Sequence, residues 1–343
     1  MESIRSAGGI LDRTREFKMD IQDKMETLGK RRINMKRGFV LGLWLGICAC
    51  GLPSSGDAQQ PSSKAESHWT VGIYTGPSPL QLSAPANVRN PVLTGADVKD
   101  LNVDTLAHPF MVVDGSRYFM FFTAKDLKSD KGGIGMAESN NGLNWRYGHI
   151  VIHEPFVLAH PYVFKWQNDY YMIPEAHTET SVRLYKATAF PDKWEYQKDL
   201  LTGDHFISPT LVWYKDMWWM FICVEGNETL RLFYARDFKG PWTEHPLSPV
   251  IKKDLHTARP AGRPFLLDGR LYRLGQDCLP VYGYQVHAFQ ITDISTTTYS
   301  EKMIESPVVR ASSKGWNAEA MHHVDAHRIS GNQWIAAVDA LGR

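Results

Sequence analysis

The sequence predicts an all-β protein folded as a five-bladed β-propeller, and three observations support this prediction. First, one phrase recurs: an apolar strand, a polar turn and an aromatic strand, which together are typical of a β-hairpin. Second, its copies are spaced close to the roughly 40 to 50 residues of a four-stranded blade. Third, two further strand-like runs follow each of the first four copies, as complete blades require.

The first copy of the hairpin shows the pattern most clearly. Apolar residues 109–113 are followed by the turn Asp114-Gly115 and by the aromatic run 118–122. Each later copy begins in the same way, with a proline or, in the last copy, a histidine before an apolar run. The five marker residues are Pro109, Pro161, Pro209, Pro264 and His323.

The two ends of this repeat predict how the ring closes. The fifth copy has no outer strands after it, whereas Trp69–Tyr74 resembles a third strand with no hairpin before it. Because an unpaired strand edge invites aggregation, we expect Trp69–Tyr74 to pair in one sheet with Trp334–Val338. The propeller is therefore predicted to span residues 69–343.

The N-terminal region has the form of an export signal. A basic start at Met35-Lys36-Arg37 precedes a short apolar run, and Gly56-Asp57-Ala58 would allow cleavage before Gln59. Residues 35–58 are thus predicted to be a signal peptide, which implies a secreted or periplasmic protein. A buried strand or a membrane anchor is the alternative, although the run is too short to span a bilayer stably.

Three further assignments follow from this region. Residues 1–34 are expected to be a non-native or mis-annotated extension, with translation starting at the methionine that opens the signal. Residues 59–68 are polar and are expected to form a linker. Ile47-Cys48-Ala49-Cys50 loosely resembles a lipid-attachment motif, so a lipoprotein is a second form of export.

Composition restricts the class of ligand. The chain of 343 residues has a formal net charge of +1, which argues against nucleic acid or an anionic membrane as the main partner and favours a neutral ligand. No zinc-binding spacing is present, and no metal or other cofactor is predicted. Cys223 and Cys278 are expected to be buried thiols, with a disulfide as the alternative. The oligomeric state is not predicted.

The candidate site lies at the propeller axis, because the first strand of every blade lines the central channel. Polar residues stand at the starts of the repeats and at the ends of the second strands, where packing alone would favour Val or Leu and where burial of a polar group is costly. The residues expected to bind substrate are His160, His177, Ser208, Glu225, Arg259, Arg263, Gln276, Tyr282 and His323. His322, at a repeat start, and Asp339, at the end of a second strand, are also expected near the axis, and no role is assigned to them.

Several phrases together carry a resemblance to a known family. They include Met172-Ile173-Pro174-Glu175, Gly240-Pro241-Trp242, Arg259-Pro260-Ala261-Gly262, and Gln276-Asp277 with Tyr282-Gly283. From about Trp69 to Asp339 the chain resembles the glucosamine inositolphosphorylceramide transferase N-terminal domain family. That domain is similar to five-bladed glycosidases such as arabinanases, β-xylosidases and fructosidases, so the resemblance implies a carbohydrate ligand, an oligosaccharide or a polysaccharide.

The chain departs from those glycosidases at all three of their standard carboxylates. The resemblance places a base Asp where this chain has His108, a pKa-tuning Asp where it has Ser208, and an acid Glu where it has Gly262-Arg263. Glycoside hydrolysis normally needs one carboxyl group as acid and another as base or nucleophile. The usual trio is therefore replaced.

Two interpretations follow, and a glycoside hydrolase-like enzyme is favoured over a non-catalytic glycan-binding propeller. In the first, Glu175, Glu225, Asp277 and Asp325 supply the carboxyl groups, and His108 or His323 supplies acid or base near neutral pH. In the second, the site binds sugar without cutting it. A scaffold for protein partners is the third alternative.

Each candidate also has a purely structural interpretation. Glu175 could form a salt bridge with an Arg of another blade, and Glu225 could be an ordinary loop carboxylate. Arg259 and Arg263 could bind a carboxylate or phosphate, or could be surface residues beside a turn. His323, Asp325 and His327 alternate along one strand, which suits either a metal or phosphorylated sugar, or a hydrogen-bonded polar face.

Overall fold

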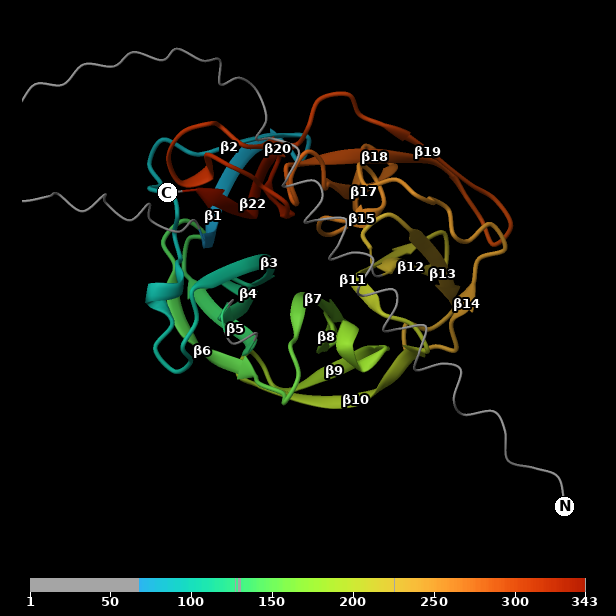
Figure 1. The fold of residues 1–343 in the computed structure, drawn as a ribbon, viewed down its shortest axis with the longest axis horizontal. Coiled ribbons are helices and arrows are strands. Elements are labelled where there is room, and N and C mark those ends of the chain that lie inside the picture. Colours follow the sequence, from blue (N-terminus) through green and yellow to red (C-terminus); the bar gives the residue numbers. More distant parts are fainter. Residues whose placement is uncertain (1–67, 127, 129–130, 225, 343) are drawn as a thin grey trace, which may run out of the picture. The chain divides into compact units, whose positions relative to one another are not determined.

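The structure is a computed structural model that describes residues 68–126, 128, 131–224 and 226–342. In this part of the chain, five antiparallel sheets are arranged around an axis as the blades of a β-propeller (Figure 1), which confirms the predicted fold class. Residues 1–67, which hold the expected extension, signal peptide and most of the linker, lie outside the described residues, as does Glu225.

Blades one to three each follow the predicted four-strand plan, with the first strand innermost. Blade one comprises β3 (Thr105–Asp114), β4 (Arg117–Asp126), β5 (Lys131–Ser139) and β6 (Arg146–Ile152). Blade two comprises β7 (Ala159–Trp166), β8 (Asp169–Glu175), β9 (Ser181–Ala189) and β10 (Lys193–Thr202). Blade three comprises β11 (Phe206–Tyr214), β12 (Met217–Val224), β13 (Leu230–Ala235) and β14 (Thr243–Glu244).

Blade four has a divided inner strand. Two short segments, β15 (Arg259–Pro260) and β16 (Phe265–Leu267), both pair with β17 (Arg270–Asp277). Gly262 lies between them with φ 142°, a conformation that suits glycine. The blade is completed by β18 (Gln285–Ile294), β19 (Tyr299–Met303) and β20 (Val309–Arg310).

Blade five closes the ring with strands from both ends of the chain. Its sheet has the order β2 (Gln81–Ser83), β1 (His68–Ser78), β22 (Gln333–Gly342), β21 (Val324–Ser330). Strands β1 and β22 run antiparallel, with Val71 opposite Asp339 and Tyr74 opposite Ala336. The predicted pairing of Trp69–Tyr74 with Trp334–Val338 is confirmed.

Large side chains fill the spaces between neighbouring blades. The ring of Trp194 on β10 lies 5.4 Å from Phe121 on β4, and Tyr299 on β19 lies 6.1 Å from Phe221 on β12. Burial of such a side chain contributes roughly 1.5–3 kcal/mol, so the aromatic residues of the repeats hold the blades together.

The described helices are short 3₁₀ turns: η1 (Gly95–Asp97), η2 (His177–Glu179) and η3 (Gly315–Asn317). Among the described residues, no helix has the length and apolar character needed to cross a membrane. The turn η2 follows the inner part of blade two directly, which places it beside the axial site described next.

Candidate functional site

In blades one to three, the residue before the marker proline takes an unusual backbone conformation. His108, His160 and Ser208 each precede a proline and have φ values of 51°, 45° and 51°. The strand pairing shifts at the same places, which are bulges in β3, β7 and β11. A positive φ at a non-glycine residue stores strain that the surrounding structure must hold in place, and bulges often re-aim side chains next to functional sites.

These strained residues are held by hydrogen bonds between blades. The backbone N–H of His160 donates to Thr123 Oγ1 at 3.0 Å, and that of Ser208 donates to Glu175 Oε2 at 2.8 Å. The backbone N–H of His108 donates to Asp339 Oδ2, also at 2.8 Å. Each acceptor stands near the end of the second strand of the preceding blade. Glu175 therefore has a structural task that a threonine performs in blade one.

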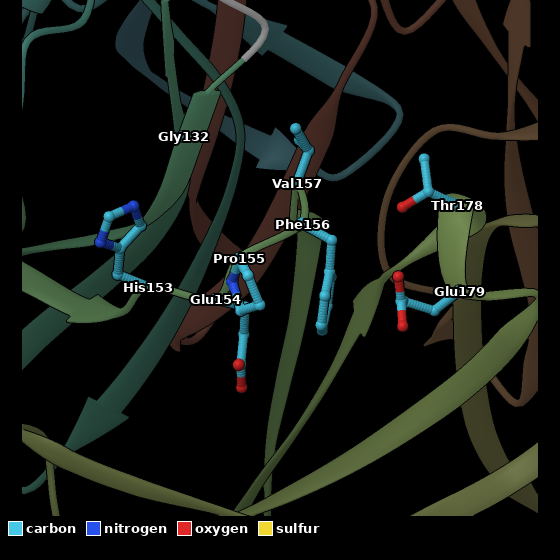
Figure 2. Close-up of a pocket in the computed structure, with 8 residues that line it drawn as sticks. All are labelled: Gly132, His153, Glu154, Pro155, Phe156, Val157, Thr178 and Glu179. Atoms are coloured by element: carbon cyan, nitrogen blue, oxygen red, sulfur yellow. The ribbon is translucent and has the colours of Figure 1, made fainter.

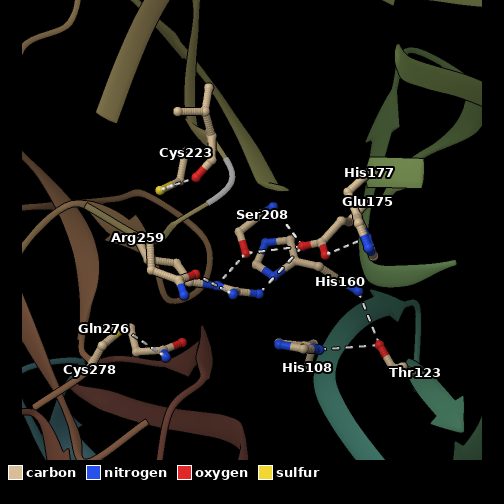
Figure 3. A network of polar contacts seen from close by, with 12 residues as sticks. His108, Thr123, His160, Glu175, His177, Ser208, Cys223, Arg259, Gln276 and Cys278 are labelled. Atoms are coloured by element: carbon tan, nitrogen blue, oxygen red, sulfur yellow. Dashed lines mark hydrogen bonds and ion pairs between the residues drawn. The ribbon is translucent and has the colours of Figure 1, made fainter. Parts of the chain in front are cut away.

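Glu175 also belongs to a buried polar network that joins blades two, three and four (Figure 3). Its Oε2 accepts from Nη2 of Arg259 at 3.5 Å, and Nε of Arg259 donates to Ser208 Oγ at 3.1 Å. The remaining side of the guanidinium donates to Asn227 Oδ1 at 2.7 Å. Arg259 is 7% exposed and Glu175 is 6% exposed, so their opposite charges compensate each other in a buried position.

This network fixes the protonation of Glu175. Burial alone would raise the pKa of its carboxyl group, but the charge of Arg259 and a contact with His177 Nδ1 at 3.4 Å outweigh burial and hold the pKa at about 2. Near neutral pH Glu175 is therefore a carboxylate. It cannot hold the proton that a general acid must donate.

Three histidines pack edge to face at the centre of the ring. The ring centroids of His108 and His160 are 5.4 Å apart, and His323 lies 5.2 Å from His160. Burial lowers the pKa of all three below its ordinary value, to about 4 for His323, so the imidazoles are neutral near pH 7. Neutral His108 can accept a proton but does not start as a proton donor.

Asp339 and His322 form a close pair beside this cluster. Oδ1 of Asp339 lies 2.6 Å from Nδ1 of His322, and both side chains are buried. Burial raises the pKa of Asp339 to about 7, although His323 and backbone N–H groups act in the opposite direction. This carboxyl group therefore exchanges its proton near neutral pH.

Aromatic rings form a rim above the pair. The indole of Trp69 stacks on the ring of His322 at 3.8 Å, and Tyr282 meets His322 edge to face at 5.4 Å. The guanidinium carbon of Arg259 lies 5.3 Å from the centre of the Tyr282 ring. Because Tyr282 is 41% exposed, the rim connects the buried network to solvent.

A second polar network lies deeper in the ring. Arg263 donates from Nε to Asp325 Oδ1 at 2.8 Å and from Nη2 to the carbonyl of Val163 at 2.8 Å. The backbone N–H of Met111 donates to Asp325 Oδ2 at 2.6 Å. Met111 and Val163 come three residues after the strained heads of their strands, which is about 10 Å along a strand. Arg263 and Asp325 therefore join blades one, two, four and five.

The carboxylate of the deeper network is closed off from solvent. Asp325 is fully buried; burial would raise the pKa of its carboxyl group, but Arg263 and His327 hold it well below its ordinary value. His327 Nε2 lies 2.8 Å from Asp325, whereas His323 packs in the histidine cluster. In the described part of the chain, no group of three or more His, Cys, Asp or Glu residues is arranged to hold a metal ion.

Two other predicted residues shape the loop that carries Tyr282. Asp277 accepts from the Leu279 backbone N–H at 3.0 Å and from Gln285 Nε2 at 3.2 Å, and it contacts His256 Nδ1 at 2.9 Å. Gln276 donates to Cys278 Sγ at 3.3 Å. These contacts give both residues a positioning task. Cys278 and Cys223 are buried free thiols, so the alternative of a disulfide does not apply.

The structure thus brings together most of the predicted axial residues. Figure 3 shows His108, His160, Glu175, His177, Ser208, Arg259 and Gln276 near one another. Tyr282 joins them beside Arg259, and His323 joins them beside His108 and His160. Arg263 and Asp325 lie apart from this group. The sequence pattern indicated no role for Trp69, for Asn227 or for the Asp339–His322 pair. Asn227 follows the second strand of blade three, as His177 follows the second strand of blade two. This equivalent position in the repeat could have indicated Asn227 as a site residue.

The fold and the site define a class: a five-bladed β-propeller with a polar, aromatic-rimmed site at its axis. Two solved structures with the same architecture are β-1,2-mannobiose phosphorylase from Listeria innocua (TM-score 0.57, 12% identity, covering 78% of this chain and 96% of that one) and a putative glycoside hydrolase from Bacteroides ovatus (TM-score 0.56, 12% identity, 75% and 95%). At this identity they support the fold alone.

Sequence comparison identifies the family. Residues 62–341 match the model described as glucosamine inositolphosphorylceramide transferase 1, N-terminal, and the chain belongs to this family. Relatives named glucosamine inositolphosphorylceramide transferase 1 occur in Oryza sativa subsp. japonica, 34% identical over 320 residues, and in Arabidopsis thaliana, 32% identical over 300 residues. The matches cover 86% and 80% of this chain but 43% and 39% of the relatives, so the chain spans less than half of their length.

Proposed function

We propose that the axial site binds a saccharide without net charge, through the network of Glu175, Ser208, Arg259 and Asn227. A sugar hydroxyl group both donates and accepts hydrogen bonds, and this network presents carboxylate, hydroxyl, guanidinium and amide groups side by side. The ion pair of Arg259 with Glu175 compensates its own charge, which disfavours a ligand with a carboxylate or phosphate at this point. The observation that carries the proposal is this buried network beneath an exposed aromatic rim.

The rim supplies the apolar part of sugar recognition. Ligand sites combine aromatic walls with a few placed polar groups, and the faces of sugar rings carry apolar C–H groups that pack against aromatic rings. Trp69 and Tyr282 stand beside the polar network in this arrangement. The relatives are named for glucosamine and inositolphosphorylceramide, so saccharides related to glucosamine or inositol that carry no net charge are the first to test.

A glycan microarray with the purified protein tests this proposal, followed by calorimetric titration of each glycan that binds. Tyr282→Ala should weaken binding by roughly tenfold, about 1.4 kcal/mol, because it removes an exposed ring at the rim. Tyr284→Ala removes another exposed tyrosine of the same loop and should bind as the parent does. No binding to any glycan, or equal effects of the two variants, would contradict the proposal.

A second candidate function is chemistry at a glycosidic bond, and the Asp339–His322 pair favours it. A general acid or base works best when its pKa lies near the working pH, and the pKa of Asp339 is about 7. Asp339 contacts Nδ1 of His322, so the opposite edge of that ring, Nε2, is the route by which a proton could reach a ligand. Ionised Glu175 would supply the second carboxyl group.

Product analysis on each glycan that binds separates the two candidates. If the site is catalytic, Asp339→Asn should lower turnover by roughly a hundredfold or more while binding is kept. Glu175→Gln tests the second carboxyl group in the same assay. Absence of any cleaved or transferred product with the parent protein would leave saccharide binding as the function and exclude this candidate.

A further inference from the structure

A large cavity lies outside the axis, between blades one and two. Its volume is about 650 Å³, and it is lined by residues of the connection from β6 to β7 and of the turn η2, together with Gly132 (Figure 2). Ligand pockets commonly have volumes of about 300–1,000 Å³, so this cavity is large enough for a sugar ring.

The cavity adjoins the axial site through a short stretch of chain. Glu175 ends β8, and η2 starts two residues later at His177, whose Nδ1 contacts Glu175. Thr178 and Glu179, the other residues of η2, line the cavity. The turn η2 therefore has the axial site at its start and this cavity at its end.

The polar groups of the cavity are held in place by residues behind them. Tyr185 Oη donates to Glu154 Oε1 at 3.0 Å, and Arg183 Nη2 donates to Glu179 Oε2 at 3.1 Å. The guanidinium of Arg183 also lies 4.6 Å from the centre of the Phe156 ring. The carboxylates of Glu154 and Glu179 and the ring of Phe156 thus line the same cavity. Tyr185 holds Glu154 in place, and Arg183 holds Glu179 and Phe156.

The charge of the lining defines the chemistry of a ligand. Of the described residues that line the cavity, none is Lys or Arg, and Glu154 and Glu179 are its charged groups. Arg183 compensates the charge of Glu179. Among the described residues, Glu154 has a hydrogen bond from Tyr185 but no ion-pair partner. A suitable ligand donates hydrogen bonds to carboxylates and packs an apolar face on Phe156.

From these observations we infer that the cavity between blades one and two is a second saccharide subsite, which takes a sugar ring presenting hydroxyl or amino groups. The inference rests on the proposed function for the class of ligand. A glycan bound at the axis would extend along η2 into this cavity. An amino sugar and a neutral sugar can both donate hydrogen bonds to the carboxylates of the cavity. Titration with each of the two sugars distinguishes them.

NMR titration of the isotope-labelled protein with D-glucosamine and with D-glucose tests this subsite. Amide signals of Gly132, Thr178 and Glu179 should shift and saturate. If the ligand amine contacts Glu154, glucosamine should bind roughly threefold or more tighter than glucose, because charge-assisted hydrogen bonds are stronger. Equal affinities would identify a neutral ring as the ligand.

Variants complete the experiment. Phe156→Ala and the milder Glu154→Gln should each weaken the shifts at the cavity at least severalfold, whereas Glu195→Gln, on an exposed part of β10, should not. Tyr282→Ala should leave the cavity response intact, so failure of the axial site is distinguished from failure of this subsite. If the cavity amides do not shift with either sugar, or shift in Phe156→Ala and Glu154→Gln as much as they do in the parent protein, the inference is overturned.

Discussion

The backbone N–H of Ser208, at the head of blade three, donates a hydrogen bond of 2.8 Å to Oε2 of Glu175, at the end of β8 in blade two. The same carboxylate accepts from Arg259 of blade four. The Glu175 side chain thus holds the strained backbone of Ser208 and the buried guanidinium of Arg259, and it links blades two, three and four. A carboxylate with these partners is suited to organise a binding site, and its low pKa makes it a poor proton donor.

Removal of the charge of Glu175 should destabilise the protein. Glu175→Gln leaves the guanidinium of Arg259 buried without its counter-ion, which should lower the free energy of unfolding by about 2 kcal/mol or more. Urea denaturation measures the change, with Glu195→Gln as the exposed control. Equal midpoints for Glu175→Gln and the parent would show that the ion pair contributes nothing.

Glu175 also predicts a loss of stability in acid. Its folded-state pKa of about 2 lies below the ordinary value of 4.5, so its contribution is fully present above about pH 4.5. The contribution should then be lost as the pH falls from 4.5 towards 2. Stability measured across this range should fall more steeply for the parent than for Glu175→Gln, and parallel curves would contradict the assignment.

Asp339 should have the opposite pH dependence. Its folded-state pKa of about 7 lies above the ordinary 3.8, so the folded protein holds a proton that the unfolded chain loses between these values. The parent should therefore lose stability as pH rises from about 4 to 7. Asp339→Asn should remove this loss and become the more stable protein at pH 8, by on the order of 1 kcal/mol or more. A variant that is less stable than the parent at every pH would refute this account.

Gly262 should tolerate no side chain. An added Cβ atom would lie 1.8 Å from the carbonyl oxygen of Val324, and φ is 142°. Gly262→Ala should thus cost roughly 3 kcal/mol or more, because the contact between blades four and five must open. Gly269→Ala is the control, since its φ is also positive but its Cβ position has no neighbour within 4 Å. Similar thermal stability of the two variants would count against this contact.

Export is proposed on the basis of the N-terminal sequence. We expect the protein from its native source to begin near Gln59 and to lie outside the cytoplasm. Mass spectrometry of the purified native protein measures the N-terminus, and incorporation of labelled palmitate would indicate the lipoprotein form. An intact segment 35–58 in a cytoplasmic fraction would refute export.

The sequence was sufficient to predict the architecture because the repeat is encoded locally. Turn residues, alternating apolar strands and a marker proline identify each hairpin, and the orphan strands at the two ends leave one way to close the ring. The division of the blade-four inner strand at Gly262 was not predictable from the pattern, since Arg263-Pro264 resembles an uninterrupted start. The conformation of Gly262 is determined by Val324 of another blade.

The meeting point of the polar residues was predictable, and their partners were less so. Polar residues at strand heads indicated the axis, and most of them do meet there. What sequence could not give was the partner of each charge: Arg263 pairs with Asp325 deep in the ring, whereas Arg259 pairs with Glu175 at the axial site. Both arginines follow similar local patterns, and only the packing of distant blades distinguishes them.

The central claim is that a saccharide binds at the axial site, against Arg259 and Tyr282. The most direct test is a crystal structure of the protein grown with the glycan that binds best in the array. The account predicts density for a sugar ring in contact with the Tyr282 ring and within hydrogen-bond distance of Arg259 or Asn227. Density for the sugar only on another face of the propeller, with the axial side chains unchanged, would contradict it.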